Sequence, residues 1–289
     1  MAATIGGFFL PGPCTDPGYE NVRDRPHHAD AREFIDLLWS RYVPLADTHF
    51  REDARNHFLE RFWEMYLAVT LTERGLHLIR TGGEGPEFYF QNEERRIWVE
   101  AVAPGPGIGP DRVPDFEFGA VSTVPTEKIL LRFTNALVEK RAKYVEAMNK
   151  GLVSTGDGYL LAINSRGIRH APYGNTMPYF VQAFLPFGPL AVAIDPKTGN
   201  VLESFYQYRP QVAKLSGAAV STKVFLEPEF AFCSAVIHSG VDCVNRPNEM
   251  GGDFCILHNP NSAGSIGQDL FSWARQLVLH GNELVDSRA

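Results

Sequence analysis

The segment Arg96-Ile-Trp-Val-Glu-Ala-Val-Ala103 gives the strongest fold signal in the chain. Ile, Trp and Val are enriched in strands, so this short apolar run predicts a buried strand. Glu100 interrupts the run, and a charge inside a buried strand is costly unless it has a partner. Glu100 is therefore the acid least typical of a surface position in this sequence.

The residues before this segment predict a helix and two further strands. A helix is expected from Glu52 to Arg74, ending at Gly75, which is a favourable residue just after a helix. Strands are expected at Leu76–Arg80 and Glu87–Gln91, separated by the turn sequence Gly82-Gly-Glu-Gly-Pro86.

The residues after this segment predict a loop, a second long helix and a fourth strand. Gly and Pro dominate 104–114, Pro125–Asn149 has helical periodicity, and Tyr159–Asn164 is a short apolar run. Residues 50–165 are therefore expected to form a helix, three strands, a helix and a strand, which indicates a mixed α/β fold.

The chain as a whole is expected to have three parts. Residues 1–30, rich in Gly, Pro, Asp and His, predict an irregular arm, and residues 31–165 form the α/β core, beginning with a helix at Ala31–Tyr42. Residues 166–289 are expected to be a β-rich extension packed on that core. Its expected elements are a short helix at Pro178–Leu185, a buried strand at Leu190–Ile194, strands at Val201–Tyr208, Val220–Leu226, Phe232–His238 and Phe254–His258, and a final helix at Gln268–Leu279.

The composition restricts the class of protein. The chain has 289 residues, 44% of them hydrophobic, and a formal net charge of −7. This charge argues against broad, non-specific nucleic-acid binding, which needs a basic surface, but it leaves room for a local basic groove.

The location of the protein is expected to be the cytoplasm. None of the four cysteines forms a C-x-x-C pair, and the first residues lack the charged and apolar regions of a signal peptide, so free thiols in a reducing compartment are expected. The uncharged stretch 171–194 is interrupted by four prolines, so no membrane span is expected.

Three acids occupy positions that suggest metal chemistry. Glu64 lies inside the first long helix, Glu87 opens the second strand, and Glu100 lies in the third. Divalent-metal cleavage of phosphodiesters needs a few oxygen ligands around one or two ions, which activate water and neutralise the phosphate.

This order of elements and acids resembles the PD-(D/E)XK, or restriction-endonuclease-like, nuclease superfamily. The matching residues are Glu64, Gly85-Pro-Glu-Phe88 and Trp98-Val-Glu-Ala-Val102. The resemblance implies a nuclease that uses Mg²⁺ or Mn²⁺ and acts on DNA or RNA. Glu87 and Glu100 would bind the metal, and Glu64 would hold a metal-bound water.

The sequence departs from this pattern at two positions. Glu87 stands where the superfamily usually has Asp, and Val102 stands where it usually has Lys. Lys140 is the candidate replacement, because helical spacing places it in the apolar stripe of the helix Pro125–Asn149. As an alternative, Glu64 and Glu100 pair with Lys140 or Arg132 in a buried ion network. That arrangement predicts a catalytically inactive protein that binds a protein or nucleic-acid partner.

Two weaker hypotheses come from the C-terminal half. Ala263-Gly-Ser-Ile-Gly267 resembles a nucleophile elbow, so a serine esterase using Ser265, Asp269 and His280 is conceivable if one helix carries both partners. A second metal site could form from His238, His258, Asp242 and Asp253.

Overall fold

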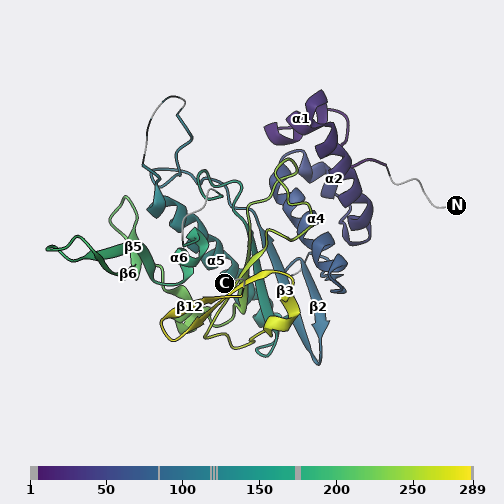
Figure 1. The fold of residues 1–289 in the computed structure, drawn as a ribbon. Helices are drawn as coiled ribbons and strands as arrows, with labels where there is room; N and C mark the ends of the chain where they lie inside the picture. The colour runs from purple at the N-terminus through teal and green to yellow at the C-terminus, as the bar shows by residue number, and fades with distance from the viewer. Residues whose placement is uncertain are drawn as a thin grey trace.

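The strand predicted around Glu100 is β3 (Arg95–Val102), and it lies inside an eight-stranded mixed sheet (Figure 1). The computed structural model describes residues 6–83, 85–117, 119, 121, 123–172 and 177–287. In order across the sheet, the strands are β1 (Ile79–Arg80), β2 (Phe88–Asn92), β3, β4 (Gly158–Asn164), β9 (Ala235–Ser239), β10 (Cys255–His258), β11 (Arg275–His280) and β12 (Glu283–Asp286).

The centre of the sheet is parallel and its margins are largely antiparallel. β3 pairs with β4 and β4 with β9 in parallel, whereas β1–β2, β2–β3 and β11–β12 are antiparallel. Every residue of β4 is buried. This burial is expected of a parallel strand with helices on both faces.

Helices cover both faces of the sheet (Figure 1). One core cluster joins the N-terminal helices to Val99 and Leu160, and a second joins the later helices to Trp98 and Leu161, because successive strand residues point to opposite faces. The first group is α1 (Pro17–Asp24), α2 (Ala29–Tyr42), α3 (Phe50–Ala54) and α4 (Phe58–Glu73), and the second is α5 (Thr126–Asn149) and α6 (Tyr179–Phe184).

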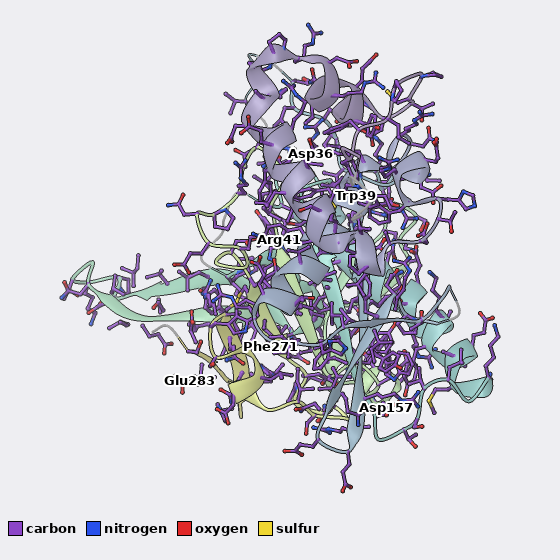
Figure 2. All side chains as sticks on the ribbon, turned by 90° about the vertical axis from the view of Figure 1, so that its right-hand side faces the viewer. Asp36, Trp39, Arg41, Asp157, Phe271 and Glu283 are labelled. Atoms are coloured by element: carbon purple, nitrogen blue, oxygen red, sulfur yellow. The ribbon has the colours of Figure 1, made fainter. Side chains whose placement is uncertain are left out.

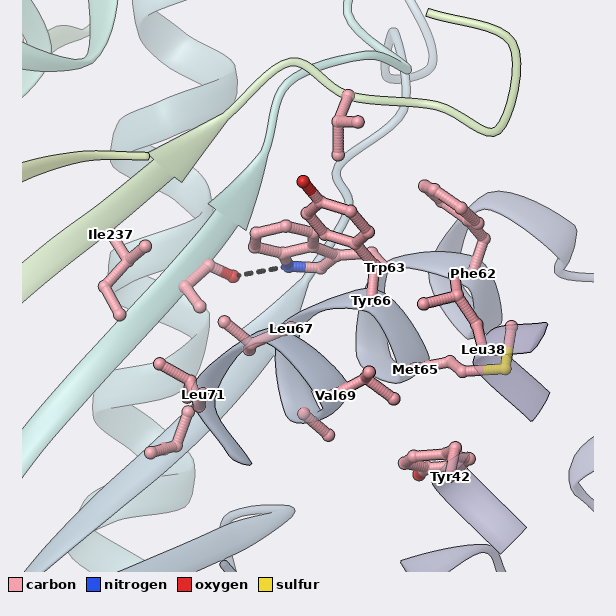
Figure 3. Packing of buried hydrophobic residues seen from close by; sticks show 14 of the residues in the cluster. Leu38, Tyr42, Phe62, Trp63, Met65, Tyr66, Leu67, Val69, Leu71 and Ile237 are labelled. Carbon is pink, nitrogen blue, oxygen red and sulfur yellow. Dashed lines mark hydrogen bonds between the residues drawn. The ribbon is translucent and has the colours of Figure 1, made fainter. Parts of the chain in front are cut away.

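A buried tryptophan fixes α4 against the middle of the sheet. Trp63 is fully buried, and its indole Nε1 donates to the carbonyl oxygen of Ala162 at 3.0 Å (Figure 3). A buried indole N–H needs such a partner. This contact holds the helix that carries Glu64 against β4.

Further aromatic packing ties α2 to its neighbours. Figure 2 labels Asp36 and Trp39 on this helix. Asp36 accepts a hydrogen bond from the Phe8 backbone N–H at 2.7 Å, and Trp39 stacks on Phe50 with ring centroids 5.9 Å apart. The N-terminal segment is therefore packed on the helical layer.

Smaller elements complete the fold. β5 (Phe187–Ile194) and β6 (Val201–Tyr208) form an antiparallel ribbon that extends away from the main sheet (Figure 1), and β7 (Gln211–Ala213) pairs with β8 (Ala219–Ser221). Short 3-10 helices lie at Pro26–His28, Val43–Leu45, Val224–Leu226, Pro228–Phe230 and Gln268–Phe271.

The order of elements predicted for residues 50–165 is confirmed. Helix α4, strands β1 to β3, helix α5 and strand β4 follow one another, and β3 and β4 are neighbours. The predicted helix Glu52–Arg74 differs in detail, because it is interrupted between Ala54 and Phe58 and forms α3 and α4.

Four expectations about the rest of the chain are wrong. The strand expected at Val220–Leu226 is only the end of β8, and a 3-10 helix follows it at Val224–Leu226. Residues 1–30 are not all irregular, because Asp16 caps α1 by accepting hydrogen bonds from Gly18 and Tyr19 N–H. The strand at 190–194 exists but is exposed, because it belongs to the ribbon. The predicted helix Gln268–Leu279 is a 3-10 turn followed by β11, which pairs in parallel with β10.

The C-terminal strands continue the sheet begun by the first half of the chain. β4, from the expected core, pairs directly with β9, from the expected extension. None of the helices in the described part of the chain is long and apolar enough to cross a membrane.

Candidate functional site

The four residues singled out in the sequence gather around one cavity of about 410 Å³. Glu64 from α4, Glu87 from the residue before β2, and Lys140 from α5 line this cavity. Glu100 lies behind the lining, only 1% exposed, and Lys140 binds it there. Elements that are distant in the sequence therefore bring these side chains together.

The pairing of β2 with β3 explains why Glu87 and Glu100 are close. Phe88 is opposite Val99 in this antiparallel pair, so the residue before β2 comes opposite Glu100. Tyr89 and Trp98, on the same face, pack with the residues of α5. Both carboxylates consequently face α5.

Glu100 is neutralised by lysines of α5. Lys140 Nζ donates to Glu100 Oε1, and Lys143 Nζ lies 3.7 Å from the same oxygen. Burial disfavours the charged lysine, but the nearby carboxylates of Glu100 and Glu87 outweigh this effect and raise the pKa of Lys140. Lys140 is therefore a firmly protonated cation at the edge of the cavity.

The carboxylate of Glu87 has fewer stabilising partners than that of Glu100. Its Oε2 accepts one hydrogen bond, from Ala101 N–H at 2.9 Å, and in the described residues no cationic side chain forms an ion pair with it. Burial and the charge of Glu100 raise the pKa of Glu87 to about 8, although Lys140 partly offsets them. This carboxyl group is thus a place where added positive charge would be favourable.

Glu64 is held in a network of its own. Its Oε1 accepts hydrogen bonds from Tyr42 Oη at 2.6 Å and Arg80 at 2.9 Å, and its Oε2 accepts one from Arg61 at 2.6 Å. Burial and the charge of Glu64 raise the pKa of Tyr42. Both oxygens of Glu64 are therefore already engaged by protein donors.

The ion network differs from the one considered in the sequence. Glu100 does pair with Lys140, but Glu64 pairs with Arg61 and Arg80. Arg132 instead donates to the Gly105 carbonyl oxygen at 2.9 Å, although it also lines the cavity.

The sequence reasoning missed several cations of the site. Arg61 lies three residues before Glu64, and Lys143 lies three residues after Lys140, so helical spacing could have indicated both. Arg80 has no such signal, because it reaches Glu64 only when β1 docks beside α4.

The donor set suits a single hard cation. Glu87 Oε1 and Glu100 Oε2 accept no hydrogen bond from the described residues, and Glu87 lines the cavity whereas Glu100 lies directly behind it. Mg²⁺ is commonly bound by one or two carboxylates and several waters. No group of three or more His, Cys, Asp or Glu side chains in the described residues has an arrangement that could hold a metal. Glu87 and Glu100 are the two neighbouring carboxylates that could hold such an ion.

The chain matches no family model, no curated protein and no solved structure.

The esterase hypothesis finds no support in the geometry. Ser265 is exposed, Asp269 lies in a 3-10 turn, and His280 ends β11, so the single helix expected to carry both partners is absent. In the described part of the chain no hydrogen bond joins these three side chains.

The histidine and aspartate groups expected as a possible second metal site have separate partners. His238 Nε2 bonds Ser165 Oγ at 2.9 Å and His258 Nε2 bonds Gln276 at 2.8 Å. Burial lowers the pKa of His238 to about 3. Asp242 pairs with Arg166 and Asp253 accepts from Ser239 and Tyr66, so all four side chains have structural contacts.

Proposed function

We propose that this protein is a divalent-metal-dependent nuclease with a restriction-endonuclease-like core. Its main support is the convergence of Glu64, Glu87, Glu100 and Lys140 on one cavity. The order of helix, three strands, helix and strand through residues 50–165 agrees with the resemblance noted in the sequence. Three cations, Arg61, Arg132 and Lys143, line the same cavity and suit an anionic substrate.

Each residue has a distinct role in this proposal. Glu87 and Glu100 would hold Mg²⁺ or Mn²⁺, and the ion would supply water activation and charge neutralisation. Lys140 stabilises negative charge that develops on the phosphate. Glu64 fixes Arg61, which lines the cavity, and also binds Arg80, so both of its oxygens already accept hydrogen bonds.

A cleavage assay on single-stranded DNA, double-stranded DNA and RNA tests this function. With Mg²⁺ or Mn²⁺, wild type should cut at least one of them, and Glu87→Gln should lose roughly 100-fold or more in rate. Lys140→Ala should be similarly impaired. Lys128→Ala is the matched control, because Lys128 contacts the Pro110 carbonyl outside the cavity.

A second function is favoured by one contact. The direct Lys140–Glu100 pair neutralises one of the two proposed ligands, which suits a catalytically inactive protein that binds nucleic acid or a protein. Tight binding of a nucleic acid with no cleavage under either ion would favour this alternative and overturn the nuclease proposal.

A further inference from the structure

The β5–β6 ribbon exposes an unusual amount of apolar surface. It projects from the body of the molecule (Figure 1), and among the described residues β5 is the one strand that pairs with β6. At least six of its large apolar side chains are 47 to 71% exposed, namely Val192, Ile194, Val201, Leu202, Phe205 and Tyr208. An isolated two-stranded ribbon is marginally stable in water, so this one needs cover.

The two edges of the ribbon differ. β5 contains Pro189, which lacks an N–H, and its register with β6 shifts at two places, after Phe187 and after Ala193. Proline and bulges protect an edge from pairing. β6, Val201-Leu-Glu-Ser-Phe-Tyr-Gln-Tyr208, has no proline, lysine or arginine, and Glu203 is its one charge. The β6 edge is therefore open to another strand.

We propose that two copies of this chain form a dimer by antiparallel pairing of their β6 edges. A twofold axis perpendicular to the ribbon sets β6 against its own copy, giving the strand order β5–β6–β6–β5. The four apolar side chains of β6, Val201, Leu202, Phe205 and Tyr208, would then lie beside those of the second copy. The ribbon would become four-stranded, and three or more strands with an apolar face are what an independent sheet needs for stability.

The side chains of β6 select one register. With the axis at Phe205, this residue faces itself, Leu202 faces Tyr208 of the second copy, and Glu203 faces Gln207 of the second copy. These are an aromatic pair, an apolar pair and a hydrogen-bonding pair. A register centred on Glu203 would set two carboxylates opposite each other, which is unfavourable.

The same register brings each ribbon tip to the base of its neighbour. Val201 comes opposite residue 209 of the second copy, next to a groove of about 540 Å³ at the ribbon base. Phe187, Tyr206, Tyr208 and Leu279 line this groove. The exposed tip residue Val201 therefore comes beside an apolar surface of the second copy.

The molar mass of the full chain in solution tests the dimer. Light scattering over a concentration series should give twice the 32.2 kDa of one chain. Phe205→Glu should raise the dissociation constant by about tenfold or more, because it sets two carboxylates opposite each other. Since Phe205 is half-exposed, the thermal melt of the monomer should hardly change. Val145→Glu, on an exposed position of α5, should leave the dimer intact.

Cysteine cross-linking tests the register. Phe205→Cys should give a covalent dimer under oxidation, because the two cysteines would face each other. Val201→Cys should not, because its copies would be about 26 Å apart. A monomeric wild type, a Phe205→Glu dimer as tight as wild type, or cross-linking only at position 201 would each overturn the proposal.

Discussion

At the scale of single residues, Glu87 is the least stable charge in the site. Glu100 has Lys140, and Glu64 has two arginines, whereas Glu87 has a single backbone N–H. Its pKa of about 8, raised by burial and then by Glu100, means that the folded chain keeps a proton that the unfolded chain loses at lower pH.

The pH dependence of the melting temperature should show that Glu87 stays protonated in the folded chain. Below the ordinary glutamate pKa both states are protonated, and between that value and about 8 only the folded state is, so Glu87 lowers stability as pH rises through this window. Glu87→Gln should therefore melt close to wild type at acid pH and several degrees higher at pH values above 8, by about 2–6 °C.

Glu93→Gln is the matched control, because Glu93 lies in the turn between β2 and β3, outside the cavity. It should leave the pH profile unchanged. A Glu87→Gln protein whose melting temperature follows the wild-type profile at every pH would show that Glu87 is ionised at little cost.

At the scale of elements, one aspartate joins two helices. Asp16 Oδ1 caps α1 through Gly18 and Tyr19, and its Oδ2 accepts a hydrogen bond from Phe58 N–H at 3.0 Å, at the start of α4. The carboxylate also lies at the positive ends of both helices. It therefore orients the helix that carries Glu64.

Loss of this double cap should destabilise the fold measurably. We expect Asp16→Ala to lower the free energy of unfolding by about 1–3 kcal/mol, since it leaves N–H groups of two helices without a partner. Chemical denaturation measures this change. Asp24→Ala is the control, because exposed Asp24 is bound by its neighbour Arg23 and caps no second helix in the described part of the chain, and it should cost much less.

Elements with their own periodicity or caps were predictable, and elements that depend on distant partners were not. The helix at Thr126–Asn149 and the strand around Glu100 follow from local patterns. The segment after Gln268 has a mixed pattern, and β10, about 20 residues earlier in the chain, makes it a strand by pairing with β11. Likewise, the strand alternation that points Glu100 toward α5 can be read from the local sequence. The partner Arg80 of Glu64 cannot, because it comes from a different element.

At the scale of the whole molecule, the site lies where the helical layers on the two faces of the sheet meet. Glu64 comes from the helical layer on one face of the sheet, and Lys140 comes from α5 on the other. An ion bound by Glu87 and Glu100 would link the start of β2 to β3 and so stabilise the folded state.

Thermal melts with and without Mg²⁺ or Mn²⁺ test this link. Above pH 8, where Glu87 is ionised, we expect either ion to raise the melting temperature of wild type by a few degrees, about 2–4 °C for each kcal/mol of binding free energy, because it relieves the repulsion between Glu87 and Glu100. Glu100→Gln should lose most of the shift.

Glu146→Gln serves as the control for that experiment, since Glu146 is on the exposed side of α5 and pairs with Lys150. It should respond to the ion as wild type does. An equal response from Glu100→Gln would mean that the ion binds elsewhere on the protein.

The parallel centre of the sheet also determines how slowly the chain can reach its native state. β3 can pair only after β4 is available, about 60 residues later in the chain, and β4 pairs with β9, about 75 residues later. Closing such long loops is entropically unfavourable, so a chain with this topology folds in milliseconds to seconds. During synthesis, β4 therefore leaves the ribosome before β9, so its edge stays unpaired until β9 is made, although α4 and α5 can already cover its two faces.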